Sequence, residues 1–296
     1  MKRTNFIKSL LAISMMSPLE TLANNLSENG TIMPVLFIGH GNPMNAIEDN
    51  EFSAYWKKLG KEIPQPTAIL CISAHWLTKG TYITAMNNPR TIHDFGGLPQ
   101  ELFDVQYPVP GNPQLARDTK SIITSTEIQL DQEWGLDHGA WSVIKPMYPE
   151  ANVPVLQMSI DYNKSGQYHY DLAQELLSLR KKGVLIIGSG NMIHNLGMVG
   201  APEGEPVTME NFKKEFGYDW ALEMNETFKT HIINKNHQAL INYEKMGKSA
   251  KMAIPTPDHY YPLLYTLGLQ KDNEAIQIFN DKCIGGSLSM TSIKIG

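Results

Sequence analysis

Four histidines of this 296-residue chain lie where a strand is expected to end or a helix to begin. They are His40, His75, His194 and His259. Neutral imidazole is a common protein ligand for zinc, iron and copper. Three or four imidazoles around one ion leave positions open for a substrate, which is typical of a catalytic rather than a structural centre. The residue types and their places therefore predict a catalytic metal site.

Glycines surround the first of these histidines. His40 stands between Gly39 and Gly41, directly after an apolar segment. Because glycine has no Cβ, it lets the backbone turn sharply and approach another group closely. We therefore expect a sharp turn here that brings the His40 ring close to the other site groups.

Two further histidines stand beside an aspartate. Asp137 precedes His138 in WGLDHGAW, and His93 precedes Asp94 in TIHDFGGLP. The first pair can orient a substrate or exchange a proton, but it is equally typical of a turn with packed tryptophans. Both interpretations are open from the residues alone. The second pair, followed by Gly96 and Gly97, can form part of a pocket rim. The other internal histidines lie in polar helical sequence and are expected to be structural: His169, His231 and His237.

Short apolar segments bounded by turn residues predict the strands that must position these side chains. They are residues 35–38, 68–73, 153–159 and 184–188. Their apolar residues run almost without interruption, as in strands that are covered on both faces. Residues 285–295 alternate with period two and predict an edge or final strand.

Helical patterns separate the predicted strands. They cover residues 112–124, 168–183, 218–234 and 256–268, with Thr256 as the expected N-cap of the last helix. Strands that alternate with helices predict an α/β fold, with one domain at residues 31–296 and a mainly parallel or mixed sheet flanked by helices. The metal site is then expected at the C-terminal ends of the strands, where ligands bind in such sheets. Residues 198–206, rich in Gly and Pro, predict a mobile loop.

Composition excludes several other classes of protein. The net charge is -5 with His neutral, and no Lys/Arg-rich run indicates nucleic-acid binding. No apolar stretch reaches the roughly 20 residues that span a bilayer. Cys71 and Cys283 lie far apart in apolar or glycine-rich sequence, so we expect two buried free thiols rather than a disulfide.

Residues 1–30 differ from the rest of the chain. Lys2, Arg3 and Lys8 precede a short apolar run, and small residues follow it, which is the order of a secretory signal peptide. A disordered leader ahead of the domain is the alternative. The first interpretation predicts a periplasmic protein and the second a cytoplasmic one.

Six motifs, in order along the chain, carry a resemblance to a known family. They are LFIGHGNPMNAIEDN, SAHW, TIHDFGGLPQELFDVQYPVPG, GLDHGAWSVIKPMYP, SGNMIHNLG and PTPDHYYPLLYTLG. From about Met33 to the C-terminus, the chain resembles the class III extradiol ring-cleavage dioxygenases, in the DOPA dioxygenase branch. The resemblance implies one mononuclear non-haem metal, normally Fe(II), and an activity that opens a catechol ring with O2 to a semialdehyde.

The resemblance also implies roles for the histidines. His40, His75 and His259 would be metal ligands. His194 would be an acid/base group or a fourth ligand, and His138 would face the substrate. An all-imidazole site suits Zn(II) as well as Fe(II), which leaves the metal open. His194 is the first candidate, and His138 the second, for the base that takes a phenolic proton.

Aromatic residues adjoin the proposed site residues in sequence and predict a flat slot for a planar substrate. They are Trp76, Trp141, Tyr260 and Tyr261. We expect His93 at the rim of the same pocket. Ordinary core packing is the alternative for each of these aromatic residues.

Two other functions are compatible with the same imidazoles. A zinc hydrolase would use the centre to activate water, with His194 as the base. A metal-binding relative without turnover would keep the histidines but catalyse nothing. Only a dioxygenase consumes O2 with a catechol, so oxygen uptake distinguishes the three. For the dioxygenase, the expected partners are a small aromatic diol and O2. The sequence does not predict the oligomeric state.

Overall fold

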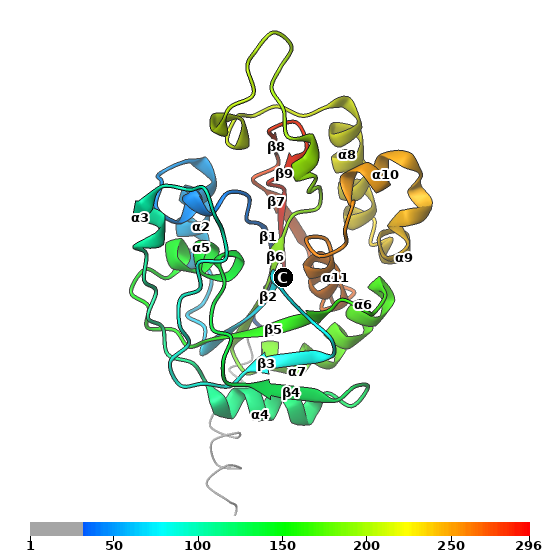
Figure 1. Ribbon diagram of the computed structural model, residues 1–296. Coiled ribbons are helices and arrows are strands. Elements are labelled where there is room, and N and C mark those ends of the chain that lie inside the picture. The colour runs from blue at the N-terminus through cyan, green and yellow to red at the C-terminus, as the bar shows by residue number, and fades with distance from the viewer. Residues whose placement is uncertain (1–31) are drawn as a thin grey trace, which may run out of the picture.

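A mixed sheet of eight strands runs through the middle of the protein (Figure 1), of which the computed structural model describes residues 32–296. Its strands are β1 Val35–Gly39, β2 Ala68–Thr78, β3 Thr81–Thr84, β4 Ile128–Asp131, β5 Val155–Asp161, β6 Val184–Gly190, β7 Ile276–Phe279 and β10 Ser292–Ile295. Their order across the sheet is β4-β3-β5-β2-β6-β1-β10-β7. A separate antiparallel pair is formed by β8 Cys283–Ile284 and β9 Leu288–Ser289.

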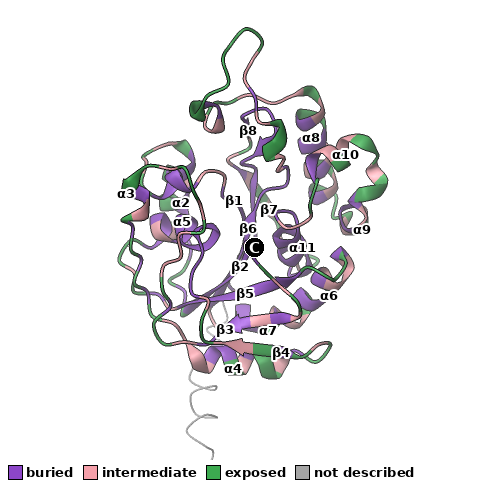
Figure 2. Ribbon diagram, viewed as in Figure 1, coloured by how far each residue is buried: buried purple, intermediate pink, exposed green. Residues whose placement is uncertain are grey.

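The four strands predicted from apolar runs are neighbours at the centre of the sheet. β5, β2, β6 and β1 lie side by side and run parallel. Alternate residues face opposite sides: Val35 and Phe37 join one core cluster, and Leu36 and Ile38 join the other. Both faces of these strands are covered (Figure 2), as their uninterrupted apolar sequences require.

The outer strands make the sheet mixed. β10 pairs antiparallel with both β1 and β7, and β3 pairs antiparallel with β5. Of the predicted last strand, residues 285–295, only β10 belongs to this sheet, and it lies inside the sheet rather than at its edge. β3, β4 and β7 were not predicted, because each has only four residues and carries polar or partly exposed positions that weaken an apolar pattern.

Helices form a layer on each side of the sheet. The α-helices are α2 Glu51–Glu62, α3 Gln100–Phe103, α4 Pro113–Ile122, α5 His138–Met147, α6 Gly166–Glu175, α7 Leu177–Lys181, α8 Asp219–Ile233, α9 His237–Ile241, α10 Lys248–Ala253 and α11 Tyr261–Gly268. The 3-10 helices are η1 Pro43–Ala46, η2 Leu196–Met198, η3 Met209–Phe212 and η4 Tyr243–Met246. α2 and α5 pack on one face of the central strands, and α6 and α11 on the other (Figure 1).

The helix predictions differ from the structure mainly at the ends. α4 begins as predicted, because the Asn112 side chain accepts a hydrogen bond from the Leu115 amide at 2.9 Å. The 168–183 pattern forms two helices that meet at Leu176. The last predicted helix starts at Tyr261 rather than after Thr256, since Pro262 and not Pro257 occupies its first turn.

Three other expectations concern the rest of the chain. Cys71 and Cys283 are buried and unpaired, as predicted. Within residues 32–296, none of the helices has both the length and the apolar character that crossing a membrane requires. The predicted leader, residues 1–30, lies outside the described residues.

Candidate metal centre

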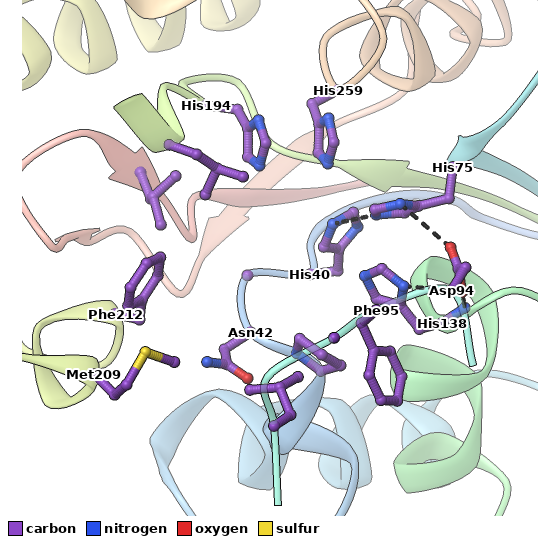
Figure 3. A pocket seen from close by; sticks show the side chains of 16 residues that line it. His40, Asn42, His75, Asp94, Phe95, His138, His194, Met209, Phe212 and His259 are labelled. Atoms are coloured by element: carbon purple, nitrogen blue, oxygen red, sulfur yellow. Dashed lines mark hydrogen bonds and ion pairs between the residues drawn. The ribbon is translucent and has the colours of Figure 1, made fainter. Parts of the chain in front are cut away.

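The structure brings five histidines to one cavity at the carboxyl ends of the central strands (Figure 3). They are His40, His75, His138, His194 and His259. The cavity has a volume of about 340 Å³, within the range of small-molecule sites. It contains every histidine to which the sequence assigned a ligand or acid/base role.

His40 enters the cavity because of its two glycines. The His40 amide donates to the Gly190 carbonyl at 3.0 Å, which extends the pairing of β1 with β6 by one residue. A Cβ at Gly39 would lie 2.7 Å from the backbone of Met290, so only glycine fits there. Gly41 has φ +59, a left-handed conformation that reverses the chain. One glycine thus allows close packing and the other makes the turn.

His75 lies inside β2, not after its end as the sequence predicted. β2 continues to Thr78, and its register against β5 shifts between Ile72 and Leu77. Such irregularities re-aim side chains, and they are frequent beside active sites. The strand is therefore longer than its apolar run, and the irregular part contains the site residue.

His259 and His194 stack on each other. His259 lies in the turn before α11, not in the first turn of that helix as predicted. Its carbonyl accepts from the Asn191 amide at 2.9 Å, and a Cβ at Gly190 would lie 2.1 Å from the same oxygen. Gly190 therefore lets this turn pack against β6. The His194 and His259 rings are parallel, with centroids 3.5 Å apart.

The imidazole nitrogens of His40 and His75 are spaced as two ligands of one ion. Their Nε2 atoms lie 3.3 Å apart. Two nitrogens that are each about 2.05 Å from a tetrahedral zinc ion are separated by about 3.3 Å. The ring centroids of His40, His75 and His259 are 5.0 to 5.2 Å from one another. These three rings surround a common space.

The possible ligand atoms form two groups, and within each group they all lie within 4.8 Å of one another. The groups are His40, His75 and His138, and His194, Asp258 and His259. The trio implied by the resemblance takes two residues from the first group and one from the second. The geometry alone is therefore compatible with more than one set of three ligands.

Hydrogen-bond partners on the far side of the rings set their orientation. His40 Nδ1 lies 3.0 Å from the Ser189 hydroxyl, which itself donates to the Gly139 carbonyl at 2.5 Å. His259 Nδ1 makes a short contact with the Asp258 carboxylate. Each partner occupies Nδ1 and leaves Nε2 for another ligand, as is usual for metal-binding histidines.

Asp94 lies beside the Nδ1 atoms of two further rings. Its carboxylate lies 3.0 Å from His138 Nδ1 and 3.5 Å from His75 Nδ1, and it accepts from the His138 amide at 2.8 Å. Burial raises the pKa of Asp94, but the contacts with His138 outweigh it and the net pKa is lowered. Asp94 is therefore an anion beside the cavity.

Burial keeps three of the cavity rings neutral. It lowers the pKa of His40 and His75 well below the usual value, and the neighbouring imidazoles lower them further. Burial and the stacked His259 lower the pKa of His194 to about 3. Neutral imidazoles keep the lone pairs that bind metal ions, so the donor set fits a divalent transition metal.

Three predicted wall residues lie outside the cavity. Trp76 follows His75 in a strand, so it points to the opposite face and stacks on Trp134. Tyr260 is buried and donates to the Leu240 carbonyl at 2.9 Å. His93 Nε2 lies 2.9 Å from the Val105 carbonyl.

The other predicted aromatic residues are likewise core residues. The Trp141 indole donates a hydrogen bond to the Ile92 carbonyl at 2.8 Å. The Tyr261 hydroxyl donates one to the Lys164 carbonyl at 3.2 Å. Of the Asp–His pair in WGLDHGAW, His138 lines the cavity, whereas Asp137 caps α5 by accepting from the Ala140 amide at 3.1 Å. Sequence adjacency to a site residue does not place a side chain in the cavity.

The remaining cavity wall is mostly apolar and was not predicted. It consists of Pro43, Phe95, Leu98, Leu196, Met209, Phe212 and Leu288, with Asn42 among them. Phe95 follows Asp94 in the TIHDFGG motif, which the sequence did single out. Met209 and Phe212 belong to η3, in a stretch without strand or helix periodicity, and no sequence signal marked them.

Comparison with known proteins identifies the family of the chain. Residues 34–285 match the family model described as the catalytic LigB subunit of aromatic ring-opening dioxygenase. The chain is 41% identical to an Escherichia coli K12 protein named 4,5-DOPA dioxygenase extradiol, over 93% of this chain and 99% of the relative. It is 33% identical to a Beta vulgaris protein of the same name, over 91% of this chain and 98% of the relative.

A solved structure supports the fold. The crystal structure of an uncharacterized Escherichia coli K12 protein superposes with a TM-score of 0.75 at 38% identity, and the match covers 89% of this chain and all of the other. The family model, the two relatives and the solved structure each match most of the described chain. The chain therefore belongs to the LigB family of aromatic ring-opening dioxygenases, as a class III extradiol enzyme of the DOPA dioxygenase type.

Proposed function

We propose that this enzyme is metal-dependent and uses O2 to open the ring of a catechol such as DOPA, giving a semialdehyde. The observation that carries the proposal is the cluster of imidazoles around a common space at one end of a substrate-sized cavity. The names of the relatives, which specify DOPA, support the choice of a catechol substrate.

The proposed metal ligands are His40, His75 and His259, with His194 as a fourth ligand or an acid/base group. A bound divalent metal supplies positive charge for the two catechol oxygens and, if it is iron, access to redox chemistry with O2. Fe(II) is the proposed cofactor for turnover. Zn(II) suits the same ligands but has no accessible redox change, so a zinc-loaded form should not consume O2.

The protein's own groups have three tasks. The Nδ1 partners Ser189 and Asp258 hold the rings of His40 and His259 in fixed orientations. The apolar wall excludes water from the bound ring. A neutral imidazole takes a phenolic proton as the diol binds and returns it later to the product.

His194 is the first proposed base and His138 the second. The His194 ring lines the cavity and stacks on the His259 ring, with centroids 3.5 Å apart. His138 also lines the cavity, and the Asp94 carboxylate lies 3.0 Å from its Nδ1. His194→Ala should therefore retain the metal but lose turnover.

The decisive experiment is oxygen consumption by Fe(II)-loaded protein with L-DOPA or catechol. One O2 should disappear for each diol, with a new visible absorbance from the ring-opened product. No oxygen uptake at verified iron occupancy would overturn the proposal. Ester or amide hydrolysis by zinc-loaded protein without O2 would favour the hydrolase instead.

A further inference from the structure

Asp137 is a fully buried aspartate that the proposed reaction does not use. It precedes α5, and its Oδ1 atom accepts a hydrogen bond from the Ala140 amide at 3.1 Å, which caps the helix. Serine or asparagine caps a helix about equally well. Burying a carboxyl group is costly unless other groups satisfy its oxygens. The cap alone therefore does not explain an aspartate at this buried position.

Three elements of the fold meet at the Asp137 carboxylate. Besides the Ala140 amide of α5, its Oδ1 atom accepts from the Ser73 hydroxyl of β2 at 2.6 Å. Its Oδ2 atom accepts from the side-chain amide of Gln157, in β5, at 2.7 Å, and Gln157 Oε1 accepts from the Asp137 backbone amide at 2.8 Å. The carboxylate thus joins the first turn of α5 to two central strands.

The Ser73 hydroxyl connects this carboxylate to His75. It donates to Asp137 and accepts from the His75 amide at 3.2 Å. The His75 backbone lies where the register of β2 against β5 shifts, between Ile72 and Leu77. Because regular pairing with β5 is interrupted there, contacts from outside the strand ladder are needed to fix the backbone. Asp137 and Ser73 together supply such a contact.

The first turn of α5 packs directly on the same segment of β2. This turn contains His138 and Gly139. A Cβ at Gly139 would lie 2.4 Å from the Ser73 Oγ atom and 2.7 Å from the His75 ring. The ring centroids of His75 and His138 are 3.8 Å apart. A shift of this turn against β2 would therefore change the separation of the two rings.

The same turn also contacts the group that orients His40. The Gly139 carbonyl accepts from the Ser189 hydroxyl at 2.5 Å, and this hydroxyl lies 3.0 Å from His40 Nδ1. His40 and His75 are two of the proposed metal ligands. Asp137 is thus linked to His75 through one side chain and to His40 through one turn of helix and one side chain.

We infer that Asp137 is a positioning residue of the metal centre, whose carboxylate fixes the first turn of α5 against β2 and thereby the spacing of the His40 and His75 rings. The inference rests on the proposed metal-dependent function. An ion binds tightly where the ligand atoms are already held close to the geometry that it requires. Asp137 acts through Ser73 and the helix turn, since it does not itself line the cavity.

Ser73→Ala tests this link without touching the helix cap. The variant keeps the hydrogen bond between Asp137 and Ala140 but loses the hydroxyl between Asp137 and the His75 amide. We expect the dissociation constant for Zn(II), measured by competition with a chelator, to rise about 10 to 100 times. The visible absorption of Co(II)-loaded protein at saturating metal should also change, because it depends on the positions of the ligand atoms. A purely structural role would lower Tm and leave that spectrum unchanged.

Ser142→Ala is the matched control. Ser142 is also fully buried and lies on α5, but its hydroxyl has no hydrogen-bond partner among the described residues and does not line the cavity. Its removal should leave the dissociation constant and the Co(II) spectrum unchanged. Equal effects in the two serine variants, or an unchanged affinity and spectrum in Ser73→Ala, would overturn the inference and leave the proposed function intact.

A double variant tests whether Asp137 acts through Ser73. Asp137→Ser keeps a capping hydroxyl, but its side chain is too short to reach both Ser73 and Gln157. It should weaken Zn(II) binding at least as much as Ser73→Ala, and the two effects should not add when the substitutions are combined. Additive effects would mean that Asp137 only caps α5. If Asp137→Ser does not fold, the comparison of the two serine variants decides.

These measurements are separate from the test of turnover. If metal binding depends on Ser73 as expected but the iron-loaded protein consumes no O2, the proposed function fails and the positioning role stands. If the unmodified protein binds neither Zn(II) nor Co(II), both are wrong.

Discussion

The two ends of β1 both bury polar groups, but they differ in what satisfies those groups. Before the strand, the guanidinium of buried Arg180 donates to the Met33 carbonyl at 2.7 Å and to the Leu269 carbonyl at 2.6 Å. The same guanidinium pairs with both oxygens of Glu274, at 2.5 and 2.9 Å. Its donors are satisfied by the protein itself.

After the strand, the arrangement is different. The Nε2 atoms of His40 and His75 face each other at 3.3 Å, and burial keeps both rings neutral. Their Nδ1 atoms have partners on the far side, whereas the Nε2 atoms point into a cavity. The Arg180 contacts at the start of β1 therefore stabilise the fold, whereas the imidazole nitrogens at its end are available to bind a ligand. Substitutions at the two ends should have separable effects.

The largest effect is expected from removing a proposed ligand. His40→Ala or His75→Ala should abolish metal retention and lower oxygen uptake about a thousandfold or more, because the centre loses the group that it needs to hold the ion. Elemental analysis and an oxygen electrode measure the two quantities. Full metal content in both variants would refute the ligand assignment.

His169→Ala is the matched control for these variants. His169 is fully buried but lies outside the cavity, with Nδ1 3.1 Å from the Tyr265 hydroxyl. Its removal should lower the free energy of unfolding and leave the metal content unchanged. Metal loss in this variant would mean that the assay reports general destabilisation.

The next largest effect should be found at the other end of β1. Arg180→Met leaves the Glu274 carboxylate without its partner, so we expect a loss of about 3–5 kcal/mol in the free energy of unfolding. Metal content and kcat should not change. Urea denaturation gives the first quantity, and the assays above give the others.

Lys282→Met provides the comparison for a more exposed cation. Lys282 pairs with Glu51 and Glu215 at the surface, where such pairs contribute at most about 1 kcal/mol. If Arg180→Met cost no more than Lys282→Met, the start of β1 would not be the stabilising end.

The same contrast explains which parts of the fold could be predicted. The central strands were predicted because burial on both faces requires long apolar runs, as in residues 184–188 of β6. β4 was missed because it is short and partly exposed, so its sequence carries little apolar signal. The continuation of β2 to Thr78 was missed because the shifted segment contains the polar residue His75.

Part of the site could be predicted, because histidines at the expected ends of strands indicate a metal site. The partners of these histidines were harder to predict, because Asp94 and Ser189 come from other parts of the chain. The sequence singled out Asp94 only as the neighbour of His93, not as a partner of His138 and His75. Trp76 was misplaced because neighbours in a strand point to opposite faces. Met209 carries no signal at all, since its contact with the cavity depends on how an irregular segment folds back.

A smaller effect is expected from the carboxylate that orients two rings. Asp94→Asn removes the negative charge beside His138 and His75, and loss of such a partner typically lowers activity or metal affinity by about 10 to 100 times. The pH dependence of kcat should also change at low pH, because the variant lacks the Asp94 carboxylate, whose lowered pKa keeps it ionised in the unmodified protein. Asp104→Asn, at an exposed site, is the control and should alter neither quantity. A normal pH profile in Asp94→Asn would mean that Asp94 has only a structural role.

The smallest effect concerns the dependence of stability on pH at the start of β1. Burial raises the pKa of Glu274, but the hydrogen bonds from Arg180 outweigh it, so the folded-state pKa is lower than the usual 4.5. A carboxylate with a depressed folded pKa stabilises the protein above about pH 4.5, and this contribution is lost as the pH falls through the folded value.

Glu274→Gln should therefore lower Tm by an amount of the order of a few degrees at pH 7, and the difference from the unmodified protein should shrink as the pH falls from 5 to 3. Thermal unfolding monitored by circular dichroism at several pH values measures this. The pH at which metal is released should be the same in both proteins, because that release depends on protonation of the imidazoles at the other end of β1. A shift of metal release in Glu274→Gln would show that the two ends of the strand are coupled.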